Sequence, residues 1–282
     1  MDFSSLKQFL AFRFDSVGFF TTLDASLNGT NPIFKGPGQI FRSSLESVIS
    51  TIFLPSRLYS LFLERLTSRI GETSLDGVLG ESAASQLFDP VCEHLRQGTV
   101  LTWTALEVFC NDSFVTLLNH VPDLARTVMD HAGCKKRFDI KNIPLETLGK
   151  YSYNVSGKMG VLFTERQAID HAAVMRDVFD AIAPQAVSLR GLLNQDRLWL
   201  LNHRRNLIVH RGALVDEFYL QSTGEQCRLG SRLEIDLGDI QKDLNLVRDI
   251  GDALLGELPG ALIFVPSQSP GKEAGGKAQS RQ

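Results

Sequence analysis

The sequence is poor in cysteine, and this scarcity excludes one large class of sites. Its 282 residues include four cysteines, which lie far apart: Cys92, Cys110, Cys134 and Cys227. No two of them form a Cys-x-x-Cys pair, so a zinc site built from paired thiolates is not expected. Two of them occupy apolar helical segments, where a thiol is typically buried and reduced. The sequence indicates neither a metal ligand set nor a cofactor.

A long apolar run and a basic N-terminal segment are also absent. A membrane-spanning helix needs about 18 or more consecutive apolar residues, and the sequence contains no such run. Residues 1–12, MDFSSLKQFLAF, carry an acid at Asp2 and no basic region before their apolar residues, unlike a secretory signal. We therefore expect no membrane span and a location in the reducing cytoplasm.

The sequence has no excess of positive charge. Its formal net charge is −3 and its pI is about 6.1. A contact with RNA or DNA would therefore depend on a local basic patch rather than on bulk charge. Hydrophobic residues make up 43% of the chain, which is enough for a packed core in one large domain or two small ones.

Apolar residues recur with a helical period along most of the chain, which predicts a mainly α-helical bundle. In the first half we predict helices over 1–27, over 39–70 with Pro55 splitting or kinking them, and over 89–119 with an interruption near Gly98. Residues 28–38, NGTNPIFKGPG, are predicted to form a loop, and residues 71–82 a linker.

In the second half, Thr164-Glu165-Arg166-Gln167 resembles a capping box, which predicts a helix from there to about residue 193, bent at Pro184. The next predicted helix is capped by Asn194 or Asp196, continues through Arg211 and ends at Gly212. Residues 213–220 and 226–237 then predict a small β-hairpin, followed by a helix over 240–258.

These boundaries predict three units. An N-terminal helical extension covers 1–75, a helical domain covers 85–260, and a tail at 266–282 is expected to be disordered because it contains no apolar anchor. The sequence does not reveal the role of the extension, and a structural role is the default expectation.

One segment stands out, HRRNLIVHRGALVDEFY at 203–219. On a helical wheel Arg205 falls within the apolar face formed by Leu198, Leu201, Ile208 and Val209. An arginine in that position needs a carboxylate, a phosphate or a water-filled cleft, because an unpaired buried charge costs several kcal/mol. Glu107 occupies the apolar face of the helix predicted over 102–119, so we expect Glu107 and Arg205 to be neighbours.

Near the predicted end of the same helix, His210 would be favoured in its protonated form by the helix dipole. Asn206 lies one turn earlier and could orient it. Arg205 and His210 point about 140° apart on a straight helix. A single copy would therefore not aim both at one phosphate, whereas two copies facing each other across a dimer could.

The spacing of Arg and His identifies nothing by itself, because it recurs by chance. It occurs at Arg126–His131, Arg166–His171, Arg197–His203 and Arg205–His210. The context of the last pair is more informative. RNLIVH at 205–210 followed by RGALVD resembles the HEPN superfamily of all-α domains, as does the upstream WTALEVFCNDSF with Glu107. The resemblance covers about residues 90–260 and extends to HEPN proteins of the RiboL-PSP type and related uncharacterised groups.

The resemblance implies a metal-independent endoribonuclease, in some members a toxin or a phage-defence effector, with its active site at a homodimer cleft. It assigns catalysis to Arg205 and His210 and supporting roles to Asn206 and Glu107. Arg204 and Arg211 would be phosphate contacts or solvated surface residues, in a stretch with four arginines and no acid between Arg197 and Arg211.

Two other interpretations remain open at this stage. The first is a HEPN-like interaction module without catalysis, which would bind an antitoxin, a nucleotidyltransferase or another protein. The second is a helical scaffold in which the Glu107–Arg205 ion pair sets the register of two helices. The RNA target, its cleavage specificity and any activating signal are not encoded in a readable motif.

Overall fold

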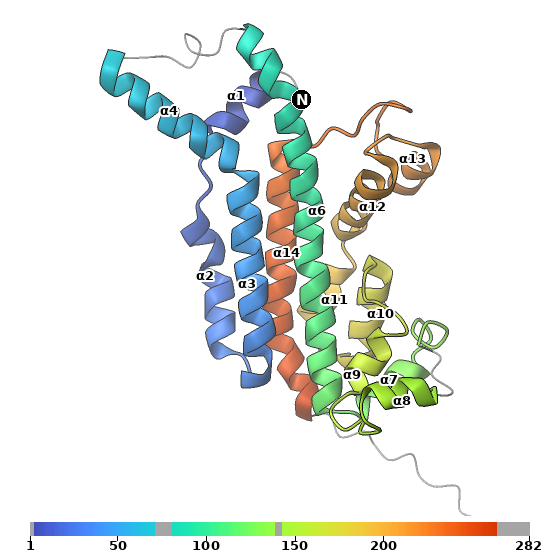
Figure 1. Cartoon of the computed structure of the whole chain (residues 1–282). Coiled ribbons are helices and arrows are strands. Elements are labelled where there is room, and N and C mark those ends of the chain that lie inside the picture. The colour runs from blue at the N-terminus through green and yellow to red at the C-terminus, as the bar shows by residue number, and fades with distance from the viewer. Residues whose placement is uncertain (1–2, 71–80, 139–142, 264–282) are drawn as a thin grey trace, which may run out of the picture.

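The computed structural model describes residues 3–70, 81–138 and 143–263. Within them the chain is mainly α-helical, as predicted. The centre consists of three long helices: α3 (Pro32–Ile52), α6 (Glu81–His120) and α14 (Leu237–Glu257). They run side by side in Figure 1 and pack along one another. Phe41 of α3 stacks on Phe109 of α6 with their ring centroids 4.4 Å apart, so aromatic burial contributes to this contact.

The N-terminal helices are α1 (Phe3–Ala11), α2 (Ser16–Gly29) and α4 (Leu54–Ile70). Of these, α2 lies along this centre, whereas α1 and α4 lie at its end (Figure 1). α2 packs on α3 and α14, while α1 packs on α4 and α6. The Thr30 hydroxyl donates to the Leu255 carbonyl at 2.7 Å and ties the end of α2 to α14. Residues of these helices therefore share a continuous core with the rest of the bundle.

The predicted loop at 28–38 is wrong, because α3 already begins at Pro32. The Asn31 side chain accepts a hydrogen bond from the Ile33 amide at 3.1 Å and caps the helix, and proline at the first helical position needs no amide donor. Pro37 lies inside α3 at the cost of one backbone hydrogen bond. The predicted split at Pro55 is confirmed, since α3 ends at Ile52 and α4 begins at Leu54.

The predicted interruption near Gly98 is also wrong, since α6 is continuous over 40 residues. Gly98 serves packing instead. A Cβ atom at this position would lie 2.6 Å from Ile52 Cγ1, so the missing side chain lets α3 approach α6 closely. Glycine in a helix interior is therefore no sufficient sign of a break.

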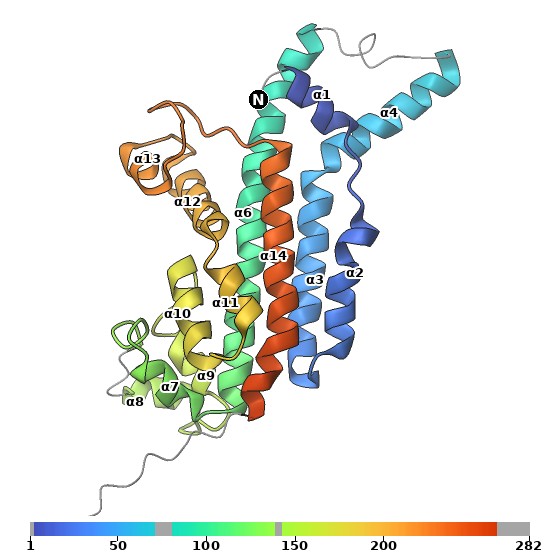
Figure 2. The ribbon, with the colours of Figure 1, turned by 180° about the vertical axis from the view of Figure 1, so that it is seen from behind.

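Shorter helices complete the chain: α7 (Leu124–Asp130), α8 (Leu145–Lys150), α9 (Met159–Thr164), α10 (Ala172–Ile182), α11 (Val187–Leu193), α12 (Asp196–Arg211), α13 (Glu217–Thr223) and the 3-10 helix η1 (Leu258–Ile263). Seen from behind in Figure 2, α11 lies against α14, and α12 with α13 continues along the same side of the bundle.

The capping box at Thr164 and the long helix after it are not formed. Thr164 ends α9, and its hydroxyl donates back to the carbonyls of Gly160 and Val161 at 3.2 Å. The next helix, α10, begins at Ala172, where the His171 side chain accepts from the Ala173 amide at 3.2 Å. Pro184 then separates α10 from α11 instead of bending one helix.

The predicted β-hairpin is wrong as well. Residues 217–223 form α13, whose first turn is capped by Asp216 accepting from the Tyr219 amide at 2.8 Å. Within the described residues this region retains an isolated bridge between Leu214 and Arg232. Ala213, Val215 and Tyr219 are buried. This spacing fits one face of a strand as well as a helix, so the hydrophobic period did not distinguish the two.

Residues 71–80 of the linker predicted at 71–82, and the predicted tail at 266–282, lie outside the described residues, while Glu81 and Ser82 already belong to α6. Among the helices described, none is long and apolar enough to cross a membrane.

Replacing Gly160 with alanine tests the close approach of α9 to α6. A Cβ atom there would lie 2.4 Å from the Val115 carbonyl oxygen and 2.5 Å from Val115 Cα. Because this neighbour is backbone, we expect Gly160→Ala to lower the free energy of unfolding by about 1–3 kcal/mol. The control is Gly191→Ala in α11, where a Cβ meets nothing within 4 Å; it should raise stability by about 0.5–1 kcal/mol. Urea denaturation measures both, and equal effects would contradict the packing.

Candidate functional site on helix α12

Helix α12 carries all the residues singled out at 204–211, and its predicted end at Arg211 is confirmed. The predicted cap at Asn194 or Asp196 is wrong, because Gln195 occupies the cap position and no side chain caps the first turn. The helix ends where Gly212 adopts a left-handed conformation with φ of 60°, which glycine tolerates without a Cβ clash. The side chains of Leu198, Leu201 and Ile208 are buried against the bundle. The helix packs on α6 and α14, with α13 on its other side.

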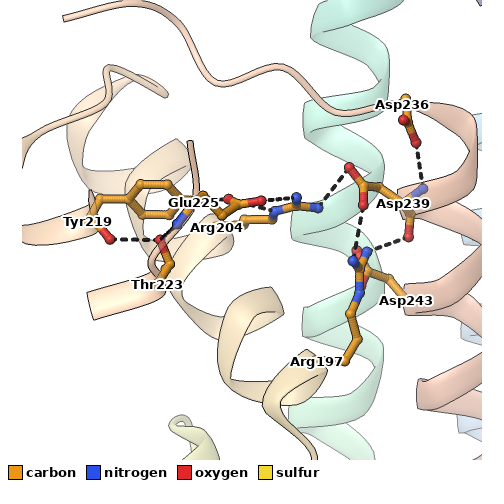
Figure 3. A network of polar contacts seen from close by, with 8 residues as sticks. All are labelled: Arg197, Arg204, Tyr219, Thr223, Glu225, Asp236, Asp239 and Asp243. Carbon is orange, nitrogen blue, oxygen red and sulfur yellow. Dashed lines mark hydrogen bonds and ion pairs between the residues drawn. The ribbon is translucent and has the colours of Figure 1, made fainter. Parts of the chain in front are cut away.

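A network of buried and partly buried charges connects α12 to α14 (Figure 3). Arg197 Nε lies 2.6 Å from Asp243 Oδ1, and its Nη1 lies 3.0 Å from Asp239 Oδ1. Arg204 Nη1 lies 3.1 Å from Asp239 Oδ2, so Asp239 joins both arginines. Arg204 also forms an ion pair with Glu225, which follows α13. The network therefore connects three segments that are distant in sequence.

The expectation that Arg204 faces solvent or RNA is wrong, because it is 4% exposed and bound by two carboxylates. The wheel analysis placed the buried arginine at 205 rather than 204. The segment 197–211 has no acid of its own after Asp196, but the tertiary structure supplies acids from α14 and from residue 225. A basic stretch in the sequence is thus largely neutralised in the fold.

Burial and ion pairing act against each other in this network. Burial raises the pKa of Asp243 to about 6, although Arg197 opposes this shift. At Asp239 burial also acts to raise the pKa, but Arg204 and Arg197 outweigh it and hold the pKa below its usual value. Burial and the hydrogen bond from its hydroxyl to Glu225 raise the pKa of Tyr219. Tyr219 is therefore a neutral donor to Glu225.

Arg205 has a different environment, and its predicted proximity to Glu107 is confirmed. Arg205 Nη2 lies 3.6 Å from Glu107 Oε2, and the Arg205 side chain remains 23% exposed. Its Nη1 donates to Asn206 Oδ1 at 3.0 Å, and Trp103 Nε1 donates to Glu107 at 3.0 Å. The pKa of Glu107 is raised above its usual value, mainly by burial and also by the charge of Asp170. Arg205 opposes this shift.

His210 and Arg211 lie on the solvent side at the end of α12. His210 is exposed, and no described residue forms a hydrogen bond with its ring. The predicted orienting bond from Asn206 to His210 is not formed; the Asn206 amide oxygen accepts from Arg205 instead. Arg211 is exposed and pairs with Asp216 at 3.2 Å. The structure thus brings Arg205, Asn206 and Glu107 together, and leaves His210 apart from them.

The sequence analysis missed a row of aromatic rings beside these residues. Trp199 and His203 lie one turn apart on α12, with ring centroids 4.6 Å apart. The Trp199 ring is 5.5 Å from His171, and the His203 ring is 6.1 Å from Phe218 of α13. The i, i+4 spacing of Trp199 and His203 was visible in the sequence, but the other two rings come from other elements.

The two histidines of this row are held neutral. Burial lowers the pKa of both His171 and His203 below the ordinary 6.5; Arg137 also lowers that of His171, and His171 that of His203. His203 Nε2 is buried and has no hydrogen-bond partner among the described residues. No group of three or more His, Cys, Asp or Glu side chains in the described part of the chain could hold a metal ion.

A second feature lies on another side of the molecule, between α1, α4 and the first part of α6 (Figure 1). It is an apolar groove of about 610 Å³, whose lining includes Leu54, Leu58, Phe62, Leu87 and Val91. Three of these side chains, Leu54, Leu58 and Phe62, are exposed on α4.

Comparison of the chain with protein-family models, curated proteins and solved structures finds no match. The HEPN resemblance therefore rests on the motif residues alone.

Arg204→Met tests the buried network. Methionine has a similar length but no charge, so it leaves Glu225 and Asp239 without their shared cation. We therefore expect the free energy of unfolding to fall by about 3–5 kcal/mol. The matched control is Arg211→Met on the same helix, whose ion pair is exposed and should contribute less than about 1 kcal/mol. Chemical denaturation of both variants checks this, and similar small losses would show that the network is not stabilising.

The lowered pKa values of His171 and His203 predict a pH dependence of stability. The two neutral histidines contribute to the free energy of unfolding fully above 6.5, the pKa of an unfolded histidine. This contribution is lost as pH falls through their lower folded-state pKa values, because the unfolded chain binds protons first. Asp243 acts in the opposite direction between its ordinary pKa of 3.8 and about 6. We therefore compare variant and wild type: His203→Gln should lose less stability between pH 7.5 and pH 5.5 in urea titrations. A parallel loss would contradict the assignment.

Proposed function

We propose that the protein is a metal-independent endoribonuclease of HEPN type. One observation carries the proposal. Glu107 and Asn206 hold the Arg205 guanidinium while leaving it partly exposed, five residues before the exposed His210 on the same helix. An arginine that is held in place and open to solvent can bind a phosphate in a bidentate way, with two parallel hydrogen bonds from one guanidinium. Arg204, which the fold neutralises, has no part in the site.

In this reaction the 2′-hydroxyl oxygen of the RNA attacks the adjacent phosphorus, and the bond from phosphorus to the 5′-oxygen of the next nucleotide breaks. The products are a 2′,3′-cyclic phosphate and a 5′-hydroxyl. His210 accepts the proton of the 2′-hydroxyl or donates one to the leaving 5′-oxygen. Arg205 stabilises the charge that accumulates on the phosphate oxygens. Glu107 and Asn206 are positioning residues for Arg205.

The active unit in this proposal is a homodimer. Arg205 reaches toward α6, whereas His210 lies on the solvent side of the helix, so one α12 does not direct both at a single phosphate. Two α12 helices facing each other would combine Arg205 of one copy with His210 of its partner. A toxin or phage-defence role in the cytoplasm, restrained by an antitoxin or another protein partner, is the physiological part of the proposal.

A second candidate function is an interaction module without catalysis. The apolar groove between α1, α4 and α6 favours it, because contiguous exposed apolar surface is typical of protein-binding sites. Its partner would be a protein, such as a nucleotidyltransferase, that buries Leu58 and Phe62. In that case the Glu107–Arg205 pair would serve only to hold α12 against α6.

The test compares wild type with His210→Ala on total RNA and on tRNA in the presence of EDTA. We expect cleavage with cyclic-phosphate ends by the wild type, and a rate at least about 100-fold lower for His210→Ala. His120→Ala is the matched control, since His120 is also exposed at the end of a helix, and should cleave normally.

Cleavage that persists in His210→Ala would refute the proposed active site. Absence of cleavage by a folded wild-type protein, together with a stable complex with a protein partner, would support the interaction module. A large loss of stability in Arg205→Ala, with no cleavage by any variant, would reduce the Glu107–Arg205 pair to a structural contact.

A further inference from the structure

The four rings of His171, Trp199, His203 and Phe218 form a continuous row contributed by three separate elements. Two of its rings are open to solvent: Trp199 is 40% exposed and Phe218 is 70% exposed. Between them His203 is buried. The two large exposed rings are therefore held against a fixed inner ring, and they need little further ordering to receive a flat ligand.

The row continues along α12 toward the proposed active site. Trp199, His203, Asn206 and His210 follow one another at spacings of four, three and four residues, which places them on one strip of the helix. At 1.5 Å per residue the strip is roughly 16 Å long. The aromatic rings lie at one end of this strip and His210 at the other, with Asn206 and its neighbour Arg205 between them.

The side chains of the strip favour a nucleic acid over a protein as its binding partner. A helix face that docks a protein partner carries aliphatic side chains at this spacing. None of the four positions on the strip is aliphatic; they carry an indole, two imidazoles and an amide. Flat rings beside cations are the features that bind unpaired nucleobases and their phosphates. The cation beside the strip is Arg205, which is hydrogen-bonded to Asn206.

We propose that this strip binds single-stranded RNA, with unpaired bases stacked on Trp199 and Phe218 and the backbone directed along α12 toward Arg205 and His210. The proposal rests on the endoribonuclease function, because it gives the path by which the substrate reaches that site. It specifies the substrate class as unpaired RNA. Duplex RNA, whose bases are covered by pairing and stacking, is excluded from the two rings.

The experiment measures binding by the full-length protein of a short fluorescent RNA whose 2′-oxygens are methylated, so that no cleavage occurs. We expect Trp199→Ala and Phe218→Ala each to raise Kd by about 5- to 150-fold, the range for loss of one stacked base. Trp199→Phe keeps a stacking face and should remain within a few-fold of wild type. The matched control is Phe62→Ala, which removes a phenylalanine that is 52% exposed on α4 and should not change Kd.

The outcomes separate this inference from the proposed function. If the wild type cleaves RNA through His210 but Trp199→Ala and Phe218→Ala bind as tightly as wild type, the stacking surface is refuted and the endoribonuclease stands. If both variants lose binding while no cleavage is found, the surface is supported and the catalytic proposal fails. Equal affinity for single-stranded and duplex RNA, or no RNA binding by the wild type, overturns the inference.

Discussion

The pairing of Arg204 with Asp239 and Glu225 is the interaction on which the orientation of α12 depends. A guanidinium with almost no exposure cannot be left unpaired, because its lost hydration costs several kcal/mol. Its two carboxylates come from α14 and from the segment after α13, so satisfying one charge places three segments together. Arg197, near the start of the same helix, adds ion pairs to Asp239 and Asp243, both of α14.

Because these ion pairs set the orientation of α12, the environment of each other side chain on the helix follows from its angle around the helix axis. Arg205, one residue on, is rotated by about 100° and meets Glu107 of α6 at the edge of solvent. Trp199 and His210 lie on the outer side. Three arginines on one helix thus differ in kind: Arg204 is structural, Arg205 is held but accessible, and Arg211 is exposed. Their similarity in the sequence concealed this division.

The long helix α6 connects the two surface features of the molecule. Val91 and His94 line the apolar groove near its start, and Glu107 meets Arg205 further along. From His94 to Glu107 the helix rises by about 20 Å without a break. Because α6 packs on α3 and α14 over most of its length, both features are built on the same rigid element. This arrangement suits precise placement of side chains better than loops would.

The sequence by itself determined the features that depend on local chemistry: the helical bundle, the end of α12 at Gly212, and the break between α3 and α4 before Pro55. It also predicted the contact of Glu107 with Arg205, because an acid and a base on apolar faces require each other. Only the tertiary structure decided that Arg204 is the buried arginine. The physical reason is that residues 225 and 239, distant in sequence, supply its counter-charges. The aromatic row and the helix in place of the hairpin likewise depend on contacts between elements, which periodicity does not contain.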